Sequence, residues 1–438
     1  MFDAMALVQM LQPQSAVKTT YQMMALSFWQ YILSHRQCAT EVHVVFDRYI
    51  EGSLKTQTRQ RRNERVSSSG PSAILSNMVV GDWKKVVSST KSKHELTKFY
   101  TRFFAEHCHE LLDDKTTVYI AGGMGEATLK VSAAYVQYVQ ALQSNHEETD
   151  GRMMLHVAHA AAHGANQVVV FSPDTDVLVL LVHHFPDMTQ TSIYFKTGRK
   201  LLYRDRTRYI PIQAIVGSLT PQQLSIMLSV YCVTGCDTSS SFHGVGKKKA
   251  FQVMCKYADE LEGLSELGIP QQMISPEAKL AAFRFVGLLY GHSNCTYLNC
   301  IRRDSMLGKK RVRPRKLPPT NDSFVLHLLR CTYKLLIWRS SLCPDIPPVD
   351  PLQYGYIQDR GTGLYVPQLM TQAVAPPELL NDLVCICPDQ CTTNCACSTN
   401  EQPCTQACTC KGNIMCENLF TMLSNVETGA DLDDAYLL

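Results

Sequence analysis

Short apolar runs alternate with helical patterns over the first 300 residues, and this alternation restricts the fold of the chain more than its other features. Strands are predicted for runs rich in β-branched and aromatic residues at 42–46, 117–121, 167–171, 177–182 and 192–195. Helices are predicted at 21–33, 94–112, 132–143, 150–162, 222–232, 247–257 and 276–290. Strands that alternate with helices predict an α/β fold with a central, mainly parallel sheet.

The composition is that of a globular protein. The chain has 438 residues, of which 45% are hydrophobic and 18% charged, and this length allows two or three domains. No apolar run reaches the roughly 18 residues of a membrane-spanning helix, so we expect no membrane span. The N-terminal segment lacks the pattern of a secretory signal. We therefore expect the 18 cysteines to be reduced or bound to metal, in an intracellular compartment.

Charge and proline content divide the chain. The net charge is only +3, but basic residues concentrate at 55–65 and 302–316. The sequence predicts a domain at 1–300, a basic linker at 301–320, a helix and Pro-rich connector at 321–382, a cysteine module at 383–418 and an acidic tail at 419–438. The basic run at 309–316 fits a nuclear localisation signal, a DNA-contacting arm or a solvated linker. We expect a nuclear protein.

Acidic residues recur at the carboxyl ends of the predicted strands, at the start of a helix and, for Asp237, at the end of a helix-like run. They are Asp47, Glu147, Glu148, Asp150, Asp174, Asp176 and Asp237. The carboxyl ends of parallel strands share one edge of a sheet, so these side chains can converge there. Mg²⁺ and Mn²⁺ prefer such oxygen ligands. Each acid alone also fits a solvated strand end or a charged first helical turn.

Three histidines lie along one side of the helix predicted at 150–162. These are His156, His159 and His163, and their spacing is that of metal ligands. No carboxylate or cysteine pattern completes a site around them. We interpret them as satisfied or exposed residues of the helix face.

A glycine-rich turn follows the last acid of the series. Asp237 precedes the sequence Gly-Val-Gly-Lys at 244–247 by seven residues, and two more lysines follow. Glycines let backbone amides approach a phosphate closely, and a helix N-terminus with lysines favours an anion. The segment predicts a helix-hairpin-helix phosphate clamp made of Gly244, Gly246, Lys247, Lys248 and Lys249.

The order of these motifs resembles the flap-endonuclease branch of the PIN-like 5′-nucleases. The motifs are Val-Val-Phe-Asp at 44–47, a basic run at 53–65, Glu-Glu-x-Asp at 147–150, Ser-x-Asp-x-Asp at 172–176 and the turn at 235–247. The resemblance covers about residues 1–290. It implies a PIN-like three-layer core and a structure-selective nuclease dependent on two Mg²⁺ or Mn²⁺ ions.

The resemblance also implies roles for individual residues. The first metal group would contain Asp3, Asp47, Glu148 and Asp150, and the second Asp174, Asp176 and Asp237. The choice between Glu147 and Glu148 stays open. Lys55 and Arg62 match the residues that contact the scissile phosphate. The implied partner is nucleic acid, branched or flapped DNA in particular, with RNA as another substrate.

Two departures from the family pattern bear on activity. The chain starts Met1-Phe2-Asp3, which omits most of the family's first strand, and Glu148-Thr149-Asp150 replaces Glu-x-Glu. Both fit an alternative function, in which an inactive nuclease fold binds nucleic acid or acts as a chromatin scaffold. Combined with the cysteine module, the core resembles uncharacterised animal proteins associated with mobile elements.

Half of the cysteines crowd into one short segment that contains three Cys-x-Cys pairs. They are Cys385, Cys387, Cys391, Cys395, Cys397, Cys404, Cys408, Cys410 and Cys416. Three tetrahedral zinc ions need about twelve ligand positions, which nine cysteines supply if three of them bridge. The pattern resembles the CXC (tesmin-like) modules of chromatin proteins, which implies a trinuclear zinc cluster. A disulfide knot and a metallothionein-like sink are the alternatives, and contact with DNA or with a protein partner both stay open.

Overall fold

The computed structural model describes most of the chain in two compact units. The first unit comprises Met1–Thr296 with Val325–Gln368, and the second Tyr297–Phe324 with Leu369–Leu438. The described residues are 1–13, 18–50, 52–55, 73–198, 200–201, 204–205, 207–270, 272–293, 296–307, 316–373, 384–387, 391, 395–399, 402–404, 408–412 and 416–422. Arg62, the run at 309–315 and the tail beyond 422 lie outside these ranges. The first unit thus includes a segment, 325–368, that lies beyond the domain predicted at 1–300.

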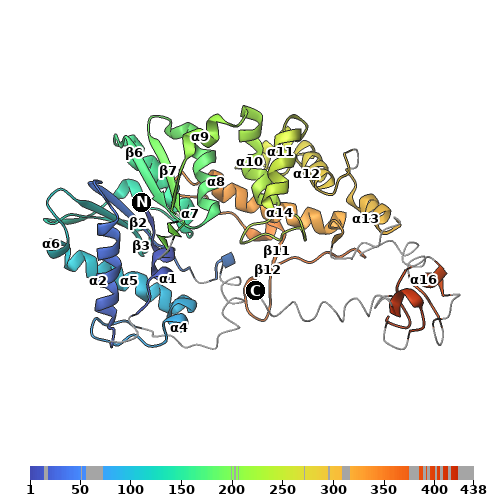
Figure 1. Ribbon diagram of the computed structural model, residues 1–438, viewed down its shortest axis with the longest axis horizontal. Coiled ribbons are helices and arrows are strands. Elements are labelled where there is room, and N and C mark those ends of the chain that lie inside the picture. The colour runs from blue at the N-terminus through green and yellow to red at the C-terminus, as the bar shows by residue number, and fades with distance from the viewer. Residues whose placement is uncertain are drawn as a thin grey trace. The chain divides into compact units, whose positions relative to one another are not determined.

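An eight-stranded sheet of order β10-β7-β6-β1-β2-β3-β4-β5 forms the centre of the first unit (Figure 1). Its strands are β1 (Phe2–Asp3), β2 (Glu41–Val45), β3 (Thr117–Met124), β4 (Ala127–Val131), β5 (Val136–Tyr138), β6 (Gln167–Phe171), β7 (Ser192–Thr197) and β10 (Arg208–Pro211). The strands from β7 to β3 pair in parallel, and β10, β4 and β5 are antiparallel at the two edges. The predicted α/β class with a mainly parallel sheet is confirmed.

Helices cover both faces of this sheet. Those of the first unit are α1 (Ala4–Met10), α2 (Tyr21–Ser34), α4 (Trp83–Ser88), α5 (Thr90–Glu106), α6 (Cys108–Leu111), α7 (Thr149–Ala162), α8 (Thr175–His184), α9 (Ile212–Gly217), α10 (Pro221–Val233), α11 (Lys247–Tyr257), α12 (Pro276–Leu289) and most of α14 (Asn321–Arg339). Short 3₁₀ helices are η1 (Gln140–Leu142), η2 (Phe185–Met188), η3 (Asp259–Glu266) and η5 (Pro351–Tyr354), and small two-stranded sheets join β8 (Lys200–Leu201) to β9 (Arg204–Asp205) and β11 (Tyr356–Gln358) to β12 (Tyr365–Pro367). The second unit contains α13 (Leu298–Leu307) and α16 (Ala396–Thr399). Among the described residues, no helix is both long and apolar enough to cross a membrane.

Side chains of β2 alternate between the two faces of the sheet and so contact the helices on each face, which gives three layers. Val42 and Val44 join a buried apolar cluster with Trp29 of α2 and Phe104 of α5. His43 points to the other face, where its Nδ1 lies 2.8 Å from Nδ1 of His156 on α7. Successive side chains of a strand face opposite sides, so this short sequence binds both helical layers to the sheet.

Two predicted elements are wrong. The run 177–182 belongs to helix α8 rather than to a strand, because Asp174 caps a helix whose apolar residues are buried on most sides. A short apolar run does not separate a buried strand from a buried helix. The helix predicted at 132–143 is instead the edge strand β5 followed by η1. Val136 and Tyr138 are exposed there and pair with β4, as β-branched and aromatic residues favour.

Candidate functional site

A cleft of about 510 Å³ opens at the carboxyl edge of the parallel strands. Its lining includes five aspartates, namely Asp3, Asp47, Asp150, Asp174 and Asp237, together with Lys55 and Lys93. Asp176 adjoins this group, because carboxylate oxygens of Asp150, Asp174 and Asp176 all lie within 4.8 Å of one another. The structure therefore brings together all the aspartates that the sequence singled out.

The strand order explains this convergence. β1 lies between β6 and β2. From β1 the chain adds β2 and β3 on one side, and later β6 and β7 on the other, so the strand order reverses at β1. Asp3 ends β1, Asp47 follows β2 by two residues, and Asp174 lies between β6 and α8. Ligand sites of parallel sheets form at such a switch in strand order, beyond the carboxyl ends. The acids are thus fixed by the sheet itself.

Hydrogen bonds orient the acids around the strand ends. Oδ1 of Asp47 accepts bonds from the backbone N–H of Thr149, at 2.9 Å, and from its hydroxyl, at 2.8 Å. This contact fixes the first turn of α7 and with it Asp150. Asp3 accepts from the backbone N–H of Ala6 and from the Ser172 hydroxyl, each at 3.1 Å.

The second half of the cleft depends on Tyr231 of α10. The hydroxyl of Tyr231 donates to Oδ1 of Asp176 at 2.6 Å. Asp174 caps α8 by accepting from the backbone N–H of Asp176 at 2.9 Å. Sequence reasoning missed Tyr231, since a tyrosine inside an apolar helix gives no sign of a polar partner elsewhere.

Burial and the repulsion between neighbouring acids make ionisation of the carboxyl groups in the cleft unfavourable. Burial raises the pKa of Asp3 to about 6, with nearby Asp47 and Asp174 adding to the rise. Burial also raises the pKa of Asp150 well above its usual range, and that of Asp176 to a smaller extent. A divalent cation relieves such charge, and a set of carboxylate oxygens is the donor type that Mg²⁺ and Mn²⁺ prefer. The residues present therefore fit these ions.

Glu148 is held differently from the aspartates. Its Oε1 lies 3.2 Å from Nζ of Lys55, and its Oε2 accepts from Nζ of Lys334 on α14. Burial opposes ionisation, but Lys334 and Lys55 outweigh it and lower the pKa of Glu148 to about 2. Its neighbour Glu147 instead accepts from the Ser53 hydroxyl at 2.7 Å. Of the pair that the sequence left unresolved, Glu148 is thus the member paired with both lysines.

Lys334 is a site residue that sequence reasoning missed, because the predicted nuclease domain ended before α14. Its side chain is only 3% exposed. A signal was nevertheless present in the sequence. Lys334 shares one helical face with Cys331, Leu335 and Trp338, all of which are buried, and a lysine within such a face needs a charged partner.

The predicted phosphate clamp forms a turn between α10 and α11. Gly244 has a φ of +73°, which favours glycine, and open space surrounds both Gly244 and Gly246. Lys248 and Lys249 are exposed at the start of α11. Lys247 is different, because its Nζ donates to the backbone carbonyls of Tyr231 and Gly235. The structure directs Lys247 to the end of α10, where backbone carbonyls favour a cation.

The three histidines of α7 lie away from the cleft. His156 is fully buried and contacts His43, and the rings of His159 and His163 stack at 4.0 Å between centroids. His163 is exposed. Among the described residues, none of the three belongs to a group that could hold a metal ion.

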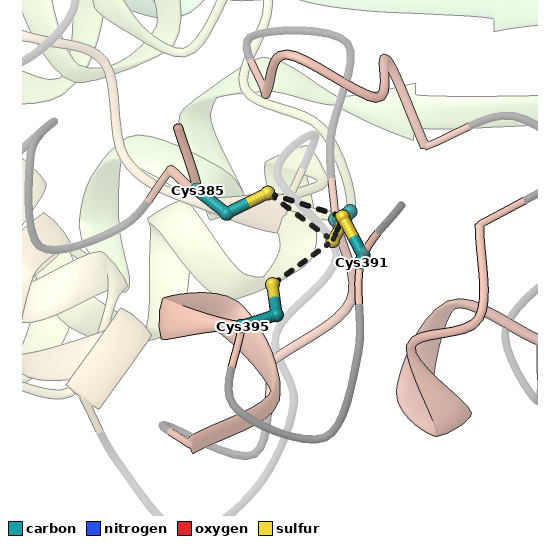
Figure 2. A group of neighbouring side chains, drawn as sticks. Cys385, Cys391 and Cys395 are labelled. Atoms are coloured by element: carbon teal, nitrogen blue, oxygen red, sulfur yellow. Dashed lines mark hydrogen bonds between the residues drawn. The ribbon is translucent and has the colours of Figure 1, made fainter. Parts of the chain in front are cut away.

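The cysteine segment brings its thiols together in three overlapping groups of four. The groups are Cys385-Cys391-Cys395-Cys404, Cys385-Cys397-Cys404-Cys408 and Cys391-Cys404-Cys410-Cys416. Figure 2 shows Cys385, Cys391 and Cys395 turned toward a common point. Cys385, Cys391 and Cys404 are shared between groups, as bridging ligands of a multinuclear cluster would be. Cys387 packs against the cluster but belongs to none of the three groups.

Contacts around Cys404 also fit a metal-bound thiolate. The side-chain amide of Asn418 donates to Sγ of Cys404 at 3.3 Å. Outer hydrogen bonds of this kind orient metal ligands and stabilise their charge. All described cysteines are free of disulfide bonds. The donor set of thiols within tetrahedral reach fits zinc.

Mn²⁺ or Mg²⁺ is expected to stabilise the protein more at about pH 7.5 than at about pH 5. The folded state raises the pKa of Asp3 from about 4 to about 6, so the metal-free fold loses stability as pH rises through that window. A cation competes with these protons and stabilises the fold by about 2.7 kcal/mol at about one hundred times its Kd. Thermal unfolding at both pH values measures the effect. In the Asp150→Asn/Asp174→Asn variant the metal-dependent shift should disappear, and equal shifts at both pH values would contradict the assignment.

The full chain should contain about three zinc ions, and Cys404→Ser should lose far more zinc than Cys387→Ser. The reason is that Cys404 belongs to all three groups and Cys387 to none. Elemental analysis of the desalted proteins gives the zinc content. Equal zinc in the two variants would show that the three groups are not the ligand sets, and thiols paired as disulfides would exclude the cluster.

Comparison with known proteins gives limited similarity. No protein-family model matches the sequence, and no curated protein matches it. Two solved structures of the bacteriophage T5 flap endonuclease align with it, one described as a pseudo-enzyme–product complex with DNA and metal ions and one co-crystallised with metal ions. Each alignment covers 77% of this chain and 98% of the other, with 14% identity and a TM-score of 0.34. The function proposed below therefore rests on the geometry of the cleft.

Proposed function

We propose that the protein is a divalent-metal-dependent nuclease that hydrolyses phosphodiester bonds in branched or flapped DNA, or in RNA. The observation that carries the proposal is the convergence of Asp3, Asp47, Asp150, Asp174 and Asp237 on one open cleft, beside Lys55. Carboxylates alone would repel a phosphate. Together with two bound cations and a lysine, the same cleft attracts it.

Each group of the cleft has a distinct part in this reaction. Asp3, Asp47 and Asp150 would hold one ion, and Asp174, Asp176 and Asp237 the other. Bound divalent ions supply positive charge that stabilises the attacking and leaving oxygens of a phosphodiester. Lys55 neutralises a phosphate oxygen, and Tyr231 keeps Asp176 oriented. Arg62 would assist Lys55.

The α10–α11 turn would hold the duplex outside the cleft. Gly244 and Gly246 leave their backbone accessible, and Lys248 and Lys249 are exposed on the following helix. These groups suit a phosphate backbone, which carries no sequence information. Lys247 contributes by fixing the turn to α10 rather than by touching phosphate. Binding of this kind recognises shape and charge.

The cysteine module would act as a separate element with about three zinc ions. Its sequence carries mixed charge, with one lysine, Lys411, and three acids, Asp389, Glu401 and Glu417. We propose a nuclear protein whose zinc module contacts a protein partner or nucleic acid.

Cleavage of labelled branched DNA in the presence of Mg²⁺ or Mn²⁺ tests the proposal directly. The wild-type chain should cut the branched substrate faster than linear duplex, and Asp174→Ala should slow cutting by at least about 100-fold. Binding of the same DNA in Ca²⁺ should persist in the variant. Wild-type protein that binds but never cuts, with either ion and with RNA as well, would instead support the nuclease fold as a binding protein.

Substitutions of basic residues should separate catalysis from binding. Lys55→Ala should lower the cleavage rate at saturating DNA by about 100-fold and change the Kd little, because the charge it neutralises grows in the transition state. Lys248→Ala/Lys249→Ala should do the reverse, weakening binding and reducing its salt dependence. Equal loss of affinity in both variants, with unchanged rates at saturation, would make Lys55 a general attractor only.

A further inference from the structure

Glu148 has both carboxylate oxygens occupied by lysines. Lys55 contacts Oε1 at 3.2 Å, and Lys334 donates to Oε2. The Glu148 side chain is 13% exposed and that of Lys334 only 3%. An oxygen that accepts from a buried ammonium group is not free to bind a metal ion. By contrast, Asp150 lines the open cleft, two residues further along the chain.

The three charges together have a defined balance. One carboxylate between two ammonium groups leaves a net charge of +1. Lys334 is buried beneath the site, with its Nζ 4.8 Å from the centre of the Trp338 ring. Lys55 is the member of the group that also lines the cleft. Within this group of three, the remaining positive charge is therefore presented by Lys55, in the same cleft as Asp47 and Asp150.

We propose that Lys334 makes Glu148 a counter-ion instead of a metal ligand and, by sharing this carboxylate, leaves the charge of Lys55 available to a phosphate in the cleft. Lys334 is a positioning residue, since it acts through Glu148 and Lys55. The inference rests on the proposed nuclease function. Helix α14, which lies far along the chain from the acidic motifs, thus contributes a charge that acts on the cleft.

Removal of Lys334 would turn the group into a neutral pair. In Lys334→Met, Glu148 would have only Lys55 as partner and would hold it away from a phosphate. In the double variant Lys334→Met/Glu148→Gln the net charge is +1 again, and no buried carboxylate is left with a single partner. The two variants therefore differ in whether Lys55 is paired with a carboxylate at position 148, while sharing the loss of Lys334.

The decisive experiment measures single-turnover cleavage and Mn²⁺ affinity in the same full-length proteins. Lys334→Met should slow cleavage by about 100-fold, and the double variant should recover at least about tenfold of that loss. Mn²⁺ affinity, from titration of the metal alone, should stay within about twofold of wild type in Glu148→Gln. The matched control is Lys98→Met, which breaks a half-exposed pair with Glu95 on α5 and should cleave as wild type does.

Two outcomes would overturn the proposal. Weakening of Mn²⁺ binding by about tenfold or more in Glu148→Gln would make Glu148 a ligand. A double variant as slow as Lys334→Met would show that Lys334 acts by packing alone. Should Lys334→Met fail to fold, the double variant and Glu148→Gln still decide between these readings. The Mn²⁺ titration needs no cleavage, so a wild-type chain without nuclease activity would refute the proposed function and leave the role of Glu148 measurable.

Discussion

The concentration of buried negative charge at the carboxyl edge of the sheet is the constraint on which the first unit depends. Asp3, Asp150 and Asp176 all ionise less readily than free carboxyl groups because they are buried beside other acids. A fold gains nothing in stability from such an arrangement. The surrounding structure maintains it by hydrogen bonds: Ser172 donates to Asp3, Tyr231 to Asp176 and Thr149 to the neighbouring Asp47. An arrangement kept at the expense of stability is typical of a functional site.

Much of this site could be predicted from the sequence because its geometry follows from local rules. The carboxyl ends of parallel strands meet at one edge of the sheet, so the proximity of Asp47 and Asp174 could be predicted from the sequence. The strand predicted at 177–182 was wrong because apolar residues alone do not distinguish a buried helix from a buried strand. The partners of Lys334 and Tyr231 could not be predicted, because these contacts span 186 and 55 residues of chain. Long-range pairing of this kind leaves no spacing to detect.

The same limit explains the ambiguous Glu147-Glu148 pair. Adjacent residues before a helix point in different directions, and the groups packed around each side chain decide which partners it finds. The Ser53 hydroxyl donates a hydrogen bond to Glu147, while Lys55 and Lys334 form ion pairs with Glu148. The sequence presents two equivalent carboxylates. The fold makes one of them a half-buried hydrogen-bond acceptor and the other the centre of a charged group.

The two candidate metal sites of the chain differ in what holds them together. The aspartates stand on or beside strands and helices of a sheet that packs against a large apolar cluster, so the cleft does not need an ion to hold its shape. In the cysteine segment, the buried cluster is made of the cysteines themselves, packed with Val384. The described residues of this segment bury little apolar surface besides the cysteines, so a bound metal ion would supply much of its folding energy. Soft thiolates select zinc and hard carboxylates select magnesium or manganese, so one chain can keep the two kinds of ion apart.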